Sequence, residues 1–132
     1  MRNITCVGLF VFLLTTSSIA GDLAGSFKDA VALADAQPTD RTTRIYEKVD
    51  LIDYYQKTYL PIFQSCLKST EKPDTSSVSF VVAIAADGRV LRVYTDRESN
   101  VFACVQPTLL KDEFPHPPIA PYYMHVSMRF SQ

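Results

Sequence analysis

The residues that could do chemistry begin with two cysteines, Cys66 and Cys104, in a chain of 132 residues. A cysteine nucleophile needs a lowered pKa and a neighbouring base. Both cysteines instead lie among apolar residues at helical spacing, where a thiol is inert or oxidised. We therefore expect them to be bonded to each other, and a mutual disulfide blocks both thiols. The alternative is a pair of buried free thiols that pack as small hydrophobic side chains.

The remaining candidate groups form no recognisable catalytic pattern. His116 and His125 are the only histidines, whereas a zinc site needs three or four clustered ligands. The carboxylates are scattered, and the four glycines do not cluster into a phosphate-binding loop. The sequence therefore predicts no catalytic residue, no metal site and no cofactor. A small envelope hydrolase or metal-binding protein is the less favoured alternative.

The N-terminus has the pattern of a cleavable signal peptide, residues 1–20. Arg2 supplies a positive charge, and residues 4–14 form an apolar run too short for a comfortable membrane span. We expect cleavage after Ala20, or alternatively after Ala24, and export to the periplasm without a stable membrane anchor. An uncleaved anchor is the other interpretation.

Export and cleavage favour the disulfide, because Cys6 is removed and an even pair of cysteines remains. Closing a loop of about 39 residues contributes about 4 kcal/mol by the chain-entropy argument. Removing 20 of the 132 residues leaves 112, which fits one compact domain over residues 21–132. Twelve basic residues then face fourteen acidic ones, interspersed and without a basic run. Nucleic acid and anionic membrane surfaces are therefore poor candidate partners.

Two helices are expected in an N-terminal helical region, residues 21–58. Ser26 can cap the first, with Asp29 close to its unpaired N–H groups. Asp40 can cap the second, whose apolar residues recur every three or four positions at Ile45, Val49, Ile52, Tyr55 and Tyr59. Pro61 predicts a kink or a restart. One apolar helix face follows it, made of Ile62, Phe63, Cys66 and Leu67.

A hairpin is expected over residues 77–95, with a two-residue turn at Asp87-Gly88 in which both positions have positive φ. This turn sets Ala86 opposite Arg89, Ile84 opposite Leu91, and Val82 opposite Val93. The core face then comprises Val78, Phe80, Val82, Ile84, Leu91 and Val93. The other face is mixed, and we expect it to meet solvent or a partner; it comprises Val81, Ala83, Ala85, Val90, Arg92 and Tyr94.

One more helix and a final strand are expected after the hairpin. Ser99 can cap a helix that carries Val101, Phe102 and Cys104, and Pro107 is expected to weaken or end its last turn. Residues 114–121 contain four prolines and must be extended. Residues 122–130 alternate as a final strand.

Several short motifs lie at the joints of these elements: Cys66, then Asp87-Gly88-Arg89-Val90, Ser99, Cys104-Val105 and Phe114-Pro115-His116-Pro117. In this order they resemble the C-terminal domain of TonB-type energy transducers, and within that superfamily the AgmX/PglI-type branch. The resemblance covers residues 59–130. It implies an α+β domain over residues 59–132, with a three-stranded antiparallel sheet (the hairpin plus the C-terminal strand) packed by helices on one face. The N-terminal helices are additional.

The resemblance also implies protein–protein contact in the periplasm and no chemistry. A TonB transducer has a membrane anchor and a long Pro-rich linker, neither of which we find here, so we expect a stand-alone version that transmits no force. The predicted function is a non-enzymatic periplasmic module that binds another envelope protein. The alternative is an immunity protein or inhibitor that neutralises a toxin directed at the cell wall or membrane. A subunit that self-associates through its last strand is a further hypothesis.

The partner is expected on the outer sheet face, at an edge strand, or at the proline corner, because strand addition to an exposed edge is a common binding mode. The tyrosines serve either as interface residues or as large core residues in a chain without tryptophan. The candidate contact residues are Tyr94, Arg92, Asp87, Gly88, Phe114, His116, Tyr123, His125 and Arg129.

Overall fold

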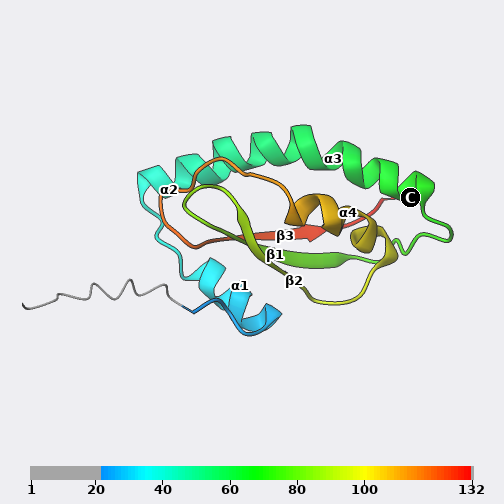
Figure 1. Cartoon of the computed structure of the whole chain (residues 1–132), viewed down its shortest axis with the longest axis horizontal. Helices are drawn as coiled ribbons and strands as arrows, with labels where there is room; N and C mark the ends of the chain where they lie inside the picture. The colour runs from blue at the N-terminus through cyan, green and yellow to red at the C-terminus, as the bar shows by residue number, and fades with distance from the viewer. Residues whose placement is uncertain (1–21, 132) are drawn as a thin grey trace, which may run out of the picture.

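A three-stranded antiparallel sheet lies between helices in this α+β fold (Figure 1). The structure, a computed structural model, describes residues 22–131, so the predicted signal peptide and Cys6 lie outside the described residues. Strand β1 (Val78–Ile84) is central, and β2 (Val90–Thr95) and β3 (Tyr122–Met128) are the two edges. The predicted strands are thus confirmed, with slightly shorter bounds.

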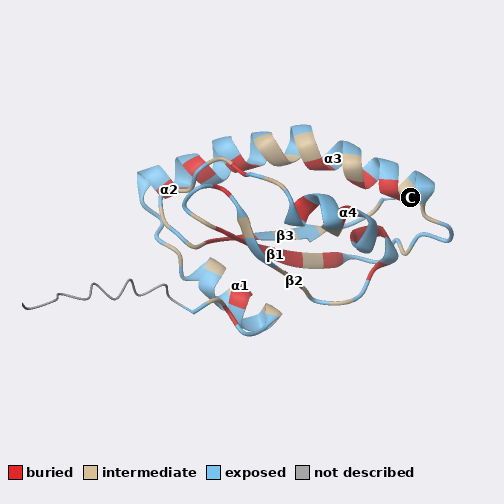
Figure 2. Cartoon of the chain, in the orientation of Figure 1, coloured by how far each residue is buried: buried red, intermediate tan, exposed pale blue. Residues whose placement is uncertain are grey.

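Helices cover both faces of the sheet rather than one. Helices α3 (Ile52–Ser69) and α4 (Asn100–Leu110) pack on the face formed by Phe80, Val82 and Ile84. Helix α1 (Phe27–Asp35) packs on the opposite face, and the central strand β1 between the helices is largely buried (Figures 1 and 2). Val81 and Ala83 on that face are fully buried. The expectation that this second face meets solvent or a partner is therefore wrong for Val81, Ala83 and Tyr94, which pack with the N-terminal helix, whereas Arg92 is exposed as expected.

The predicted helix starts are confirmed. The side chains of Ser26, Asp40 and Ser99 each accept a hydrogen bond from the backbone N–H three residues later. The predicted restart at Pro61 is wrong, since α3 runs through it without a break, and α4 likewise continues through Pro107 to Leu110. Both prolines are exposed. The carbonyls left without an intrahelical partner can therefore be hydrated, which lowers the cost of an interior proline.

A π-helical turn changes which residues of the long helical segment face the core. Helix α2 (Arg41–Ile45) leads through η1 (Tyr46–Leu51) into α3. A π-turn holds an extra residue, so it rotates the pattern that a regular helix would present. Of the predicted apolar stripe, Ile45, Val49 and Ile52 are exposed, Val49 by 57%. Tyr46 and Leu51 are buried in their place, and the stripe resumes at Tyr55 and Tyr59.

The hairpin turn also differs from the predicted form. The N–H of Ala85 donates to the carbonyl of Arg89 (2.8 Å) and the N–H of Gly88 to that of Ala85 (2.9 Å), so the loop holds three residues. Within this loop of three residues only Gly88 has positive φ, as expected for a turn followed by a left-handed residue. Val82 pairs with Val93 as predicted, but Ile84 pairs with Val90, because the strands carry a bulge there. Leu91, predicted in the core, is consequently 47% exposed, and Val90 packs against the core.

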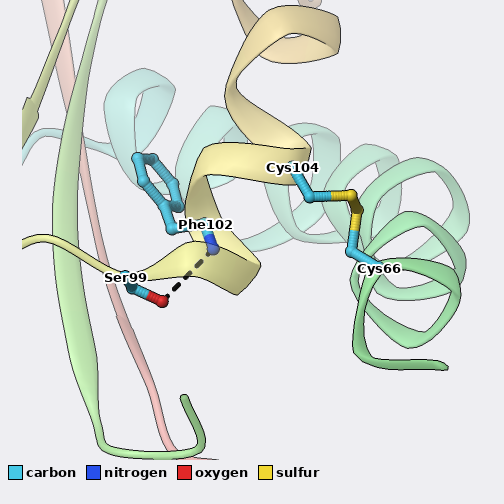
Figure 3. Close-up of a disulfide and its surroundings, with 4 residues drawn as sticks. All are labelled: Cys66, Ser99, Phe102 and Cys104. Carbon is cyan, nitrogen blue, oxygen red and sulfur yellow. Dashed lines mark hydrogen bonds between the residues drawn. A yellow bond between two sulfur atoms is a disulfide. The ribbon is translucent and has the colours of Figure 1, made fainter. Parts of the chain in front are cut away.

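The predicted disulfide is confirmed: Cys66 of α3 and Cys104 of α4 are bonded (Figure 3). The bond lies on the side of α4 away from Phe102, whose ring packs against Phe80 of the sheet. It therefore joins the two helices that cover the main core. The boundary expected at residue 58 falls inside α3, so the N-terminal region and the remainder share one continuous helix.

Candidate functional site

A groove of about 580 Å³ runs along the outer edge of β3. One wall is the end of α1 and the residues after it, including Asp35 and Gln37, and the other is η1 and the start of α3, including Glu47 and Tyr55. The β3 residues His125 and Ser127 line its floor. The groove therefore exposes a strand edge between helices from the two layers of the fold.

The backbone groups on this edge follow from the register. In an antiparallel pair, alternate residues turn their N–H and C=O away from the neighbouring strand. Tyr123 does so, because both groups bond the side chain of Gln37: its N–H donates to Oε1 at 2.6 Å, and its carbonyl accepts from Nε2 at 3.0 Å. His125 and Ser127 follow at steps of two and share this orientation. Among the described residues, no hydrogen bond reaches their outward backbone groups.

The groove has acidic character. Asp35 and Glu47 are exposed on opposite walls, and no lysine or arginine is among the residues that line it. The His125 ring lies edge-on to Phe27 of α1, with ring centroids 6.1 Å apart. The Ser127 hydroxyl is 2.8 Å from that of Ser79 on the neighbouring strand. The side chains of His125 and Ser127 thus contact α1 and β1, respectively, while their backbone groups face the groove.

The Phe114 end of the proline corner is packed into the fold, whereas His116 is exposed. Phe114 is 2% exposed, and its ring stacks on that of Tyr59, with ring centroids 5.8 Å apart. Its N–H donates to the carbonyl of Gly88 at 2.8 Å, which fastens the hairpin turn to the corner. The hydroxyls of Tyr54 and Tyr59 both donate to Oδ2 of Asp112, at 2.6 and 2.5 Å. This network joins α3, the hairpin and the residues before the corner.

The structure does not gather the sequence-predicted contact residues on one surface. Tyr94, Gly88, Phe114 and Tyr123 are buried, and of these four Tyr123 alone lines the groove. The exposed members belong to separate parts of the molecule. Arg92 lies on β2, 5.2 Å above the Tyr94 ring, whereas His125 lies on β3 at the opposite edge, with Arg129 just beyond the end of that strand. Asp87 is in the hairpin turn, and His116 is 3.9 Å from Glu113.

Sequence reasoning missed Gln37, Asp35, Glu47 and Ser127. Gln37 is hydrogen-bonded to Tyr123, which lies 86 positions away in sequence, and no local sequence pattern predicts such a contact. Glu47 reaches the groove because it lies in the π-turn. The alternation of residues 122–130 was the only available signal, since it marks Ser127 and His125 as members of one strand face.

All seven tyrosines contribute to the interior of the fold, one of the two uses expected for them, and Tyr55, Tyr122 and Tyr123 also line the groove. Tyr46, Tyr59, Tyr94, Tyr122 and Tyr123 are buried, and Tyr54 and Tyr55 pack against the main core. Burial, together with the Asp112 carboxylate, raises the pKa of Tyr54 to about 12, and burial with the nearby Glu47 raises the pKa of Tyr122 to about 12. Burial also raises the pKa values of Tyr46, Tyr55, Tyr59 and Tyr94.

These raised pKa values predict alkaline unfolding. Tyrosines of the unfolded chain ionise near pH 10, before those of the folded state, so above that pH the unfolded state binds fewer protons. The stability is fully present below about pH 10 and is lost as the pH rises from about 10 to 12. Urea unfolding across this range, followed with tyrosinate absorbance, measures the effect. An unfolding midpoint that does not move between about pH 9 and pH 11.5 would contradict it.

No protein-family model, curated protein or solved structure matches this chain. Within residues 22–131, no helix is long and apolar enough to cross a membrane, and no group of three or more metal-ligating side chains could hold a metal ion. The groove and its strand edge are therefore characterised by their own geometry. The disulfide is consistent with an exported protein.

Proposed function

We propose that this protein is a non-enzymatic module of the periplasm that binds another envelope protein at the β3 edge. Three surfaces were candidates from the sequence. Helix α1 packs over Val81, Ala83 and Tyr94 of the outer sheet face, and the Phe114 ring of the corner packs against Tyr59. The β3 edge retains a groove and outward backbone groups, and this observation carries the proposal.

Two further features support a binding role. Gln37 braces the start of β3 through two hydrogen bonds to Tyr123, so one wall of the groove is joined to its floor before any partner arrives. A preorganised surface loses less entropy on binding. The resemblance of residues 59–130 to the TonB C-terminal domain also favours contact with a protein, and a TonB-like stand-alone domain in the periplasm remains part of this proposal.

Cross-linking in cells tests the proposal. We expect a photo-crosslinking amino acid at Ser127, on the groove floor, to give a discrete adduct with one other protein. The matched position is Lys68, which is exposed on α3 and does not line the groove. No adduct at Ser127, or the same adduct from both positions, would overturn the proposal. The identity of the adduct separates an envelope partner from a toxin that an immunity protein would neutralise.

A further inference from the structure

We infer that the occupant of the β3 groove is an extended segment of a partner protein that carries adjacent basic side chains, and that Gln37 fixes where its pairing ends. This inference rests on the proposed function and specifies the partner. The strand edge supplies the first part of the argument. The outward N–H and C=O groups of His125 and Ser127 are the pattern that an added strand pairs with.

The side chain of Gln37 limits where an added strand can pair. Its carboxamide accepts from the N–H of Tyr123 and donates to the carbonyl of the same residue, at 2.6 and 3.0 Å. These are the two hydrogen bonds that a residue of an added strand would make at that position. The side chain therefore occupies the first pairing place on the edge, and the added strand pairs from His125 onward. Gln37 acts as a positioning residue that fixes the register.

The charges on the groove walls favour a basic occupant. Asp35 and Glu47 lie on opposite walls of the groove, and none of its lining residues is a lysine or arginine. Side chains of an extended segment alternate between its two faces, so neighbouring residues point to opposite walls. A segment with two adjacent basic residues therefore meets one carboxylate on each side. Opposite charges across an interface steer association and penalise acidic competitors.

A second copy of this chain fits the groove less well. Two-fold pairing of β3 with β3 would bring Asp35 and Glu47 of both copies to a single seam. Four carboxylates around one seam repel each other, whereas a basic segment relieves the charge already present. The same argument disfavours an acidic segment.

Three synthetic peptides test the inference on the exported protein. The first is a capped extended octapeptide with an adjacent lysine pair between valines and threonines; the second has glutamate for lysine. The third is the lysine peptide with methylated backbone nitrogens, which cannot pair as a strand. We expect binding of the first alone, with slower amide hydrogen exchange at His125 and Ser127. Equal binding of the lysine and glutamate peptides, or of the methylated one, would overturn the inference.

Variants of the walls sharpen the test. Asp35→Asn and Glu47→Gln should each weaken binding of the lysine peptide about two- to fivefold, as expected for an exposed ion pair. The matched control is Asp53→Asn, an exposed carboxylate of α3 that pairs with Lys57 and does not line the groove. It should leave the affinity unchanged. An equal loss with Asp53→Asn would show a general charge effect and contradict the assignment to the groove.

Gln37→Ala distinguishes a positioning role from a merely structural one. The variant opens the pairing place at Tyr123, so the lysine peptide should bind about threefold or more tightly, and the Tyr123 amide should become protected only when the peptide is present. Weaker binding with no new protection at Tyr123 would contradict this role. A free protein that sediments as a dimer, with the His125 and Ser127 amides already protected, would overturn the inference in favour of a second copy.

The cross-linking experiment separates failure of this inference from failure of the proposed function. An adduct at Ser127 together with equal binding of the lysine and glutamate peptides rejects the basic segment and retains the binding module. Absence of the adduct rejects the module itself.

Discussion

Loss of the Cys66–Cys104 disulfide is expected to lower the free energy of unfolding by about 4 kcal/mol. The bond joins positions 38 apart in sequence, so it removes much of the conformational freedom of the unfolded chain. Domains of this size are stable by about 5–15 kcal/mol, and the loss is therefore a large part of the total. Urea unfolding of the Cys66→Ala/Cys104→Ala double variant against the wild type measures it.

A thiol reductant provides the control for this prediction. It should lower the unfolding midpoint of the wild-type protein to near that of the double variant, and leave the double variant unaltered. The comparison separates the covalent bond from side-chain packing, because Cys66 is also a buried core residue. A wild-type midpoint that is insensitive to reductant, under conditions in which free thiols appear, would show that the bond contributes little to stability.

Local signals in the sequence predicted the local structure well. The N-caps Ser26, Asp40 and Ser99 depend on contacts three residues apart, and all were confirmed. The central strand followed from alternation over 77–86, and the disulfide from the expected export and an even count of cysteines in the expected mature chain. These features depend on neighbouring residues or on composition, which a sequence shows directly.

The errors arose where distant segments decide the outcome. The π-turn at Tyr46–Leu51 moves Val49 outward, and Tyr46 instead packs edge-on against Tyr122, with ring centroids 5.0 Å apart. The second sheet face was expected to be uncovered because no residue close to Val81 in sequence predicts its packing against Ala30 of α1. The groove depends on both of these outcomes together with the contact from Gln37 to Tyr123, so its composition could not be predicted from the sequence.

The hairpin turn combines a correct local signal with a contact that the sequence hides. Asp87-Gly88 marked the turn, but the requirement for glycine at position 88 is stricter than the turn alone imposes. Gly88 has φ of +86°, and a Cβ built there would lie 2.0 Å from the carbonyl oxygen of Phe114. The neighbour is backbone, fixed by the hydrogen bond from Phe114 N–H to the Gly88 carbonyl and by the buried Phe114 ring. It cannot move aside without disturbing the corner.

Gly88→Ala is therefore expected to destabilise the protein by about 2–3 kcal/mol. The left-handed backbone costs a residue with a side chain about 1–2 kcal/mol, and loss of the hydrogen bond to Phe114 adds about 1 kcal/mol. The matched control is Gly25→Ala, where the added Cβ meets only Asp29 Oδ2 at 3.8 Å. We expect the control to stay within about 0.5 kcal/mol of the wild type.

A second variant, Gly88→Asn, separates backbone strain from the steric clash. Asparagine tolerates positive φ better than alanine does. If strain were the whole effect, asparagine would recover much of the loss. Because any Cβ meets the Phe114 carbonyl, we expect asparagine to recover only part of the backbone strain, about 1 kcal/mol, and to stay clearly less stable than the wild type in urea unfolding. Recovery to near wild-type stability with asparagine would mean that the hairpin turn and the corner can separate, and that the corner is not held by this contact.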